Sequence, residues 1–254
     1  MVGGGSRTDG EPLVSFDAGE ERMEVTFLSV GIEEGADGSA LVHSLGFPGC
    51  VAFGATAQEA LDVYTAELSE WLAFRESVAL PVPPRDAEIE ITVDEWVASD
   101  AAVERGESEV CFEADLRPLR DTEINEGLHL LGDLRGRLLR ELRRLPRGTL
   151  EQASAEEMSL RRIVDELARA QWWTLTRLGA SPLAEVPASP LGRLDTAMAL
   201  VVQQFTGFVR ETRDQVLEVE GEVWTPRKVL RRLLWLEWWL GKAALAALER
   251  EAPR

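Results

Sequence analysis

The chain has 254 residues, 45% hydrophobic and 28% charged, the composition of a folded globular protein. Its formal net charge of −18 is unevenly spread. Residues 1–117 carry 25 acidic side chains against 6 arginines, whereas residues 118–254 carry 20 acidic against 21 basic ones. So acidic a first half repels the phosphates of nucleic acids, which argues against direct nucleic-acid binding. The charge instead favours a basic protein partner or solubility alone.

Membrane insertion and export are not expected from the sequence. No apolar run reaches the roughly 18 residues that cross a bilayer, and the first residues lack the basic flank and apolar stretch of a secretory signal. We therefore expect a cytoplasmic protein. In that reducing compartment the two cysteines, Cys50 and Cys111, are expected to be small buried side chains rather than a disulfide or reactive thiols.

The first half of the chain shows strand patterns around one helix. Residues 1–21 are rich in Gly, Ser and acids and are predicted to be a disordered tail. Thr56 and Glu59 form a capping-box pattern, in which the Glu59 carboxylate would accept from the Thr56 amide, and helical spacing lasts from there to Ser77. Alternating apolar residues and turn signals predict strands over 23–30, 40–45, 50–53, 89–93 and 110–114.

From about residue 121 the apolar period changes to 3.6, which is typical of helices. The N-caps are expected at Ser159 or just before it and at Thr225, and Ser189-Pro190 opens the third helix. The predicted helices cover 128–142, 158–178, 190–217 and 226–249. Four long helices with modest loops predict a bundle.

The expected fold class is therefore α+β in two domains after a tail. Residues 1–21 form the tail. Residues 22–117 form an acidic α/β domain, with a small antiparallel sheet and one main helix. Residues 118–254 form an all-α four-helix bundle.

The first module resembles the HicB antitoxin family. The resemblance lies in residues 46–52, Gly-Phe-Pro-Gly-Cys-Val-Ala, in residues 54–61, Gly-Ala-Thr-Ala-Gln-Glu-Ala-Leu, and in a late Trp71 of the helix that follows. It covers about residues 23–84 and implies a small sheet with one or two helices. In that family the module blocks a small basic toxin, and a DNA-binding segment usually follows. Here a helical module follows instead, so the resemblance implies a basic protein partner more than a repressor.

The second module resembles the DinB/YfiT-type four-helix bundle, through residues 158–164, 170–173 and 224–235. The resemblance covers about residues 121–249. Many members bind a divalent metal through three His, one from the second helix and an i, i+4 pair from the fourth. They act as thiol-dependent transferases or hydrolases.

The metal ligands of that family are missing from this chain. Glu166 occupies the position of the second-helix His, and Leu236 and Leu240 occupy the i, i+4 pair. Leucine offers no lone pair to a cation, and His129 is the one histidine of the module. We therefore expect no metal and no cofactor.

The former metal site supplies the candidate pocket residues, which are His129, Glu166, Trp173, Leu236 and Leu240. Glu166 is the weak candidate for an acid or base, because burial without a partner would raise its pKa. The alternative that we favour pairs Glu166 with an arginine or turns it toward solvent. His129 is expected to be an ordinary helix residue.

For other polar and aromatic residues of the bundle, the sequence allows more than one location or role. Glu237 is expected on the flank of the fourth helix, and the tryptophans are expected in the core rather than around a pocket. Bases early in the second and fourth helices either receive an anion or the acidic module in cis, or they lie on a solvated face, which we favour. These bases are Arg161, Arg162, Arg227, Lys228, Arg231 and Arg232.

These observations favour a non-catalytic interaction or ligand-sensing protein. The acidic module would bind a basic partner, and the bundle would serve as a scaffold and homodimer interface. One alternative is a transferase or hydrolase that uses the bundle pocket, with Glu166 as its acid or base. A weaker alternative is an antitoxin-like protein.

Overall fold

A computed structural model provides the fold, and it describes residues 25–103, 107–146, 149–150, 159–180 and 185–251. The predicted disordered tail of residues 1–21 lies outside these ranges. So do the predicted first residues of a strand at Met23 and of a helix at Met158.

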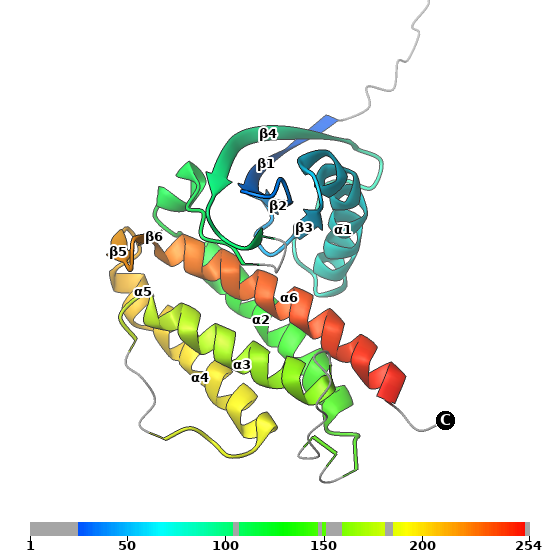
Figure 1. Ribbon diagram of the computed structural model, residues 1–254, viewed down its shortest axis with the longest axis vertical. Coiled ribbons are helices and arrows are strands. Elements are labelled where there is room, and N and C mark those ends of the chain that lie inside the picture. Colours follow the sequence, from blue (N-terminus) through cyan, green and yellow to red (C-terminus); the bar gives the residue numbers. More distant parts are fainter. Residues whose placement is uncertain (1–24, 104–106, 147–148, 151–158, 181–184, 252–254) are drawn as a thin grey trace, which may run out of the picture.

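The described strands of the first half form one four-stranded sheet in the order β3-β2-β1-β4 (Figure 1). Strands β1, β2 and β3 pair antiparallel, whereas β4 runs parallel to β1. The α+β class is confirmed, but the sheet is mixed rather than wholly antiparallel. A parallel pair requires a crossover connection, which the helix between β3 and β4 supplies. The bounds are Val25–Gly35 for β1, Ala40–Ser44 for β2, Val51–Gly54 for β3 and Glu88–Ser99 for β4.

Helix α1, Ala57–Ser77, begins as the capping pattern predicts, with one difference. The Thr56 hydroxyl accepts from the Glu59 amide at 3.2 Å, but the Glu59 carboxylate accepts from the Ala55 amide at 3.1 Å rather than from Thr56. The buried face of α1 packs on β2 and β3. It consists of Ala57, Ala60, Tyr64, Leu68, Trp71, Phe74 and Arg75.

Gly49 allows the turn before β3 to lie against this helix. Its φ is +105°, a conformation that L side chains rarely adopt, and a Cβ there would lie 2.8 Å from the Trp71 ring and 2.9 Å from Leu234. The Pro-Gly-Cys motif therefore places backbone between the first module and the helical half.

The strand predicted over 110–114 is wrong, because this segment ends in a turn of 3₁₀ helix, η2, Glu113–Leu116. Carboxylates satisfy its first amides. Asp115 accepts from the Phe112 amide at 3.1 Å, and Glu95 accepts from the Glu113 amide at 2.7 Å. Apolar alternation does not reveal such side-chain bonds, which compete with strand pairing.

The helical half forms the expected bundle, in which α6 contacts α2 and α3, and α4 contacts α3 and α2. Ser159, Ser189 and Thr225 act as N-caps, since each side chain accepts from the amide three residues later. The helices are α2, Asp121–Leu142; α3, Leu160–Thr176; α4, Pro190–Thr206; and α6, Pro226–Glu251.

The third helix of the bundle ends earlier than its apolar pattern predicts. It stops at Gly207, and a short helix α5, Phe208–Glu211, follows. A hairpin then joins β5, Leu217–Val219, to β6, Glu222–Trp224. Its two turn residues, Glu220 and Gly221, both have positive φ, as the twist of a tight hairpin requires.

Helix α6 joins the two halves, because it lies between the bundle and the sheet-bearing part (Figure 1). One hydrophobic cluster contains Leu28 and Trp71 from the first half together with Leu230 and Leu234 of α6. Among the described helices, none has both the length and the apolar character needed to cross a membrane.

Candidate functional site at the junction of sheet and bundle

The first turns of α6 contact the acidic half of the chain directly. Our prediction that these bases lie on a solvated face is wrong for Lys228 and Arg231, which are only 1% and 5% exposed. The Lys228 ammonium donates to the Glu109 carbonyl at 2.6 Å and to the Val223 carbonyl at 2.9 Å. These two bases instead follow the other alternative, in which they bind the acidic module of the same chain.

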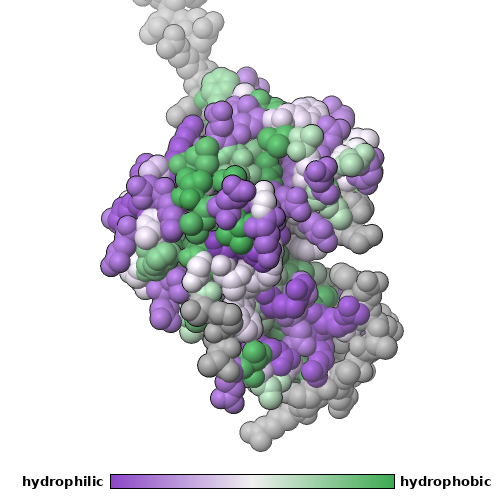
Figure 2. Space-filling view, turned by 60° about the vertical axis from the view of Figure 1, so that its left-hand side comes forward, coloured by the Kyte–Doolittle hydropathy of each residue, from purple (hydrophilic) through white to green (hydrophobic). Residues whose placement is uncertain are grey.

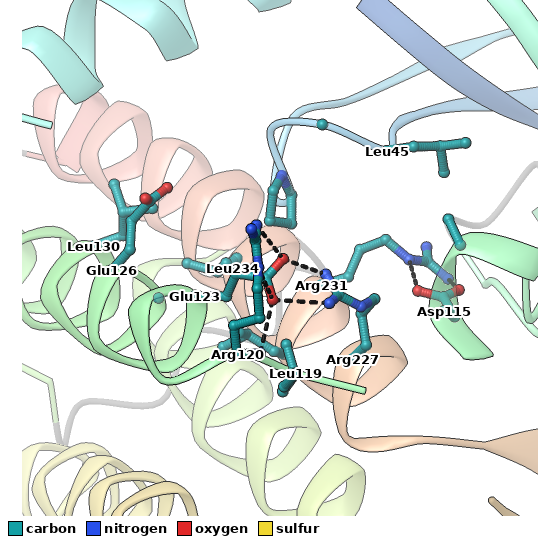
Figure 3. Close-up of a pocket in the computed structure, with 15 residues that line it drawn as sticks. Leu45, Asp115, Leu119, Arg120, Glu123, Glu126, Leu130, Arg227, Arg231 and Leu234 are labelled. Carbon is teal, nitrogen blue, oxygen red and sulfur yellow. Dashed lines mark hydrogen bonds and ion pairs between the residues drawn. The ribbon is translucent and has the colours of Figure 1, made fainter. Parts of the chain in front are cut away.

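Arg231 is the centre of this contact (Figure 3). Its guanidinium binds both carboxylate oxygens of Asp115, at 3.1 Å from Nε and 2.7 Å from Nη2. Its Nη1 lies 3.0 Å from Nδ1 of His43 on strand β2. Because arginine has no lone pair to offer, Nδ1 is the acceptor, and the ring proton of neutral His43 is on Nε2.

The Nε2 atom of His43 lies 3.4 Å from the carboxylate of Glu33 on strand β1. Glu33 also accepts from the Ser108 hydroxyl and from the Glu109 amide, so it fixes the segment that precedes η2. Glu33, His43, Arg231 and Asp115 thus form a continuous buried polar chain, which we call the junction chain.

Burial and pairing oppose each other in the pKa values of the junction chain. Burial alone would raise the pKa of Glu33, but the hydrogen bonds and charge of His43 and the bonds from Ser108 and the Glu109 amide lower it to about 2. Burial lowers the pKa of His43, and the nearby Arg231 cation lowers it further. Glu33 and Asp115 act in the opposite direction, but the net shift is downward. Both groups are held in the state in which Glu33 is charged and His43 is neutral.

A second ion pair borders the same junction in Figure 3. Arg227 of α6 binds Glu123 of α2 through two contacts of 2.7 and 2.8 Å, and Arg120 adds a contact of 3.2 Å. Partial burial opposes ionisation of Glu123, yet the two arginines lower its pKa to about 2.

Next to these pairs, a cavity of about 130 Å³ lies between the turn at Pro48, η2 and the helices α2 and α6. At about 30 Å³ per water molecule it has room for a few waters. Its polar lining residues, among them Arg231, Asp115 and Glu123, are already paired with one another. The junction is therefore built to hold the two halves together rather than to bind a large ligand.

Four of the five candidate pocket residues do come together, but in a groove separate from the junction cavity. Glu166, Trp173, Leu236 and Leu240 line a groove of about 630 Å³ between α3, α6 and the segment around Ser108. Both leucines are buried in a hydrophobic cluster, at 8% and 7% exposure. His129 is not in the groove; it is half exposed and lies 2.9 Å from Asp133.

Glu166 takes the alternative that we favoured. Its carboxylate binds Arg169 at 2.6 and 3.0 Å on the same helix, and 45% of its side chain is exposed. It therefore does not face the bundle axis as an unpaired acid.

The inward carboxylate of the bundle is Glu237, and our prediction that it lies on the helix flank is wrong. It binds Arg135 at 2.8 and 2.9 Å and accepts from Gln171 at 2.6 Å, all three side chains being buried. Helical spacing could have indicated this position. Glu237 lies four residues after buried Leu233 and three before buried Leu240, and so it is on the same face of the helix.

Tryptophans divide between core and surface. Trp224 and Trp235 are buried as expected, whereas Trp239 is 46% exposed and stacks on Trp235 at 5.9 Å between ring centroids. Trp173 is partly buried between the guanidinium groups of Arg177 and Arg232.

The potential metal ligands and the two thiols can be placed individually. Within the described ranges, no group of three or more His, Cys, Asp and Glu side chains is placed to hold a metal ion. Cys50 and Cys111 are free thiols; Cys50 is buried, but Cys111 is only partly so. Burial raises the pKa of both, to about 11 for Cys111, so both are thiols rather than nucleophilic thiolates at neutral pH.

Comparison of the chain with protein-family models, with curated proteins and with solved structures finds no match. Function must therefore be inferred from the residues and their geometry.

Proposed function

We propose that this chain is a non-catalytic, cytoplasmic interaction protein whose acidic α/β module binds a basic protein partner. The bundle would act as the scaffold that holds the module and as a homodimer interface. The observation that carries the proposal is a contrast between two groups of acidic side chains in the first half.

One group is buried and used internally, and another is exposed and forms no ion pair with a described base. Glu33 and Asp115 are buried against His43 and Arg231. On strand β4, by contrast, Glu88, Glu90 and Asp94 are exposed, and no base in the described part of the chain forms an ion pair with them. Exposed charge of one sign attracts and orients a partner of the other sign.

Hydrophobic side chains accompany this exposed charge. Phe27 of β1 is 66% exposed and Trp96 of β4 is 55% exposed. Figure 2 shows hydrophobic residues, in green, gathered on the upper, sheet-bearing half of one face, with hydrophilic ones around them. Apolar side chains ringed by polar ones are typical of protein-binding surfaces.

For the homodimer, the support is the exposure of apolar side chains on α4 and α5. Val202 and Phe208 are each 40% exposed there. We expect light scattering to give twice the chain mass, and substitution of both residues by Ser to give the mass of one chain.

Ligand sensing has one supporting feature, the groove of about 630 Å³. Arg232 lines it, donates to the Ser108 carbonyl, and has a buried Nε without a hydrogen-bond partner. The transferase alternative has less support, because its acid–base candidate, Glu166, is paired and exposed. The antitoxin alternative predicts a small basic toxin encoded by a neighbouring gene.

The test of the proposed function is affinity capture from the native host at low and at high salt. We expect a stoichiometric basic protein that is released at high salt, because screening weakens exposed charge pairs. Capture of no stoichiometric partner, or of an acidic one, would contradict the proposal. Metal analysis and a thiol-adduct screen separate it from the transferase alternative, which predicts bound metal or an adduct.

A further inference from the structure

Strand β4 leaves one of its edges open. It is the last strand in the sheet order, and no described residue outside the β1 pairing forms a backbone hydrogen bond with it. Past its middle, the Glu95 carboxylate accepts from the amides of Glu113 and Ala114, so η2 is attached to the strand at that point. The register with β1 also shifts there, which leaves Asp94 as a bulge. The open stretch is therefore residues 88–94.

The two faces of this stretch differ in chemistry. Residues paired in register share a face, so Ile91 and Val93 lie beside buried Leu28 and Val30 and continue the core to the edge of the sheet. Ile89 on this face is 37% exposed and Val93 is 40% exposed. The opposite face has Glu88 and Glu90, beside the exposed side chains of Val25 and Phe27.

From this placement we infer that β4 accepts one strand of a partner protein, in which apolar residues alternate with Lys or Arg. Its apolar residues extend the row of Ile89, Ile91 and Val93, and its bases lie opposite Glu88 and Glu90. Its backbone satisfies the open amides and carbonyls of the edge. This inference rests on the proposed function and adds the place and the pattern of the partner.

A second copy of this chain is the less suitable occupant. An antiparallel β4 pair would bring Glu88 and Glu90 of both copies onto one small surface, and facing like charges destabilise paired strands. A basic strand removes that repulsion and turns it into attraction. Charge complementarity therefore selects a partner rather than self-association at this edge.

The test uses the full chain and two peptides of the same composition and the length of stretch 88–94. One alternates Arg and Val, and the other has its Arg residues in a single block. Calorimetry is expected to give tighter binding of the alternating peptide. The variant E88R/E90R should weaken that binding by about tenfold or more and should gain binding of an alternating Glu–Val peptide. Both residues are exposed and form no ion pair with any residue that the structure describes, so the variant is expected to fold.

The matched control is D62R/E218R, which makes the same change of net charge at exposed positions on α1 and β5. It should keep tight binding of the alternating peptide. If both Arg peptides bound equally well and both variants lost the same amount of affinity, the β4 site would be overturned. The proposed attraction of the chain to basic proteins would then still stand. Binding of neither basic peptide would overturn the proposed function as well. A dimer that E88R/E90R dissociates would overturn the choice of partner over second copy.

Discussion

The junction chain and the β4 edge hold acidic side chains of the same module in opposite circumstances. At the junction, Glu33 and Asp115 are buried, and their oxygens bind a histidine, an arginine, a hydroxyl and backbone amides. On β4, Glu88 and Glu90 are exposed, and no base among the described residues forms an ion pair with them.

This contrast distinguishes carboxylates that hold the fold together from carboxylates that can bind another molecule. A buried carboxylate that loses its partner is left desolvated, so the junction acids are committed to holding the two halves together. An exposed carboxylate contributes little to stability and remains free for another molecule. The net charge of the first half therefore does not itself measure how much charge is free for a partner.

The largest effect should come from Arg231→Met, which leaves Asp115 buried without its cation. We expect the free energy of unfolding to fall by about 3–5 kcal/mol, as measured by urea denaturation. Arg140→Met, on an exposed part of α2, is the control and should change stability by about 0.5 kcal/mol or less. A small loss for Arg231→Met would mean that the junction is not held by this pair.

Glu237→Gln tests whether burial alone explains such a cost, away from the junction. Arg135 would keep an oxygen acceptor but lose the charge that balances its own, and we expect a loss of about 2–3 kcal/mol. Glu166→Gln removes an exposed arginine pair and should cost about 0.5 kcal/mol or less. Similar losses in both variants would argue against burial as the cause.

Acidification should weaken the junction in two steps. His43 has a lowered pKa in the folded chain, so its contribution is present above the ordinary value of 6.5 and is lost as the pH falls below it. The pKa values of Glu33 and Glu123 are about 2 in the folded chain, below the ordinary value of 4.5. Their contribution to stability is therefore present above pH 4.5 and is lost as the pH falls from 4.5 toward 2.

Tryptophan fluorescence during urea unfolding at several pH values would measure both steps. His43→Gln, whose amide oxygen can accept from Arg231, should lose the upper step and keep the lower one. Constant stability of the parent chain between pH 7 and 5 would contradict the role of His43.

The smallest effect on stability should come from E88Q/E90Q. Neither carboxylate has a partner in the described ranges, so the free energy of unfolding should change by about 0.5 kcal/mol or less, while basic-partner binding weakens. A loss comparable to that of Arg231→Met would remove the distinction between the two regions.

Much of the fold follows from local patterns in the sequence. The caps at Thr56, Ser159, Ser189 and Thr225 are local hydrogen bonds, and they mark helix starts reliably. Periodicity missed what depends on side-chain acceptors and on partners distant in the chain. The turn η2 exists because Asp115 and Glu95 satisfy its amides, and β4 is parallel because of the crossover through α1.

The candidate site was only partly predictable for the same reason. The family resemblance singled out Glu166, Trp173, Leu236 and Leu240, which line one groove in the structure, but it did not predict that Glu166 would bind Arg169. Arg231 and His43 are 188 residues apart in the chain, so no local pattern predicts their contact. The basic cluster in the sequence was the one hint of that junction.

Hydrogen–deuterium exchange along β4, with and without the alternating Arg–Val peptide, tests the central claim most directly. Amides of residues 88–94 that are open in the free chain should become protected on binding, while those of the junction segment 107–115 stay unchanged. Protection that appears elsewhere and leaves 88–94 unchanged would show that the open edge of the sheet is not where a basic partner binds.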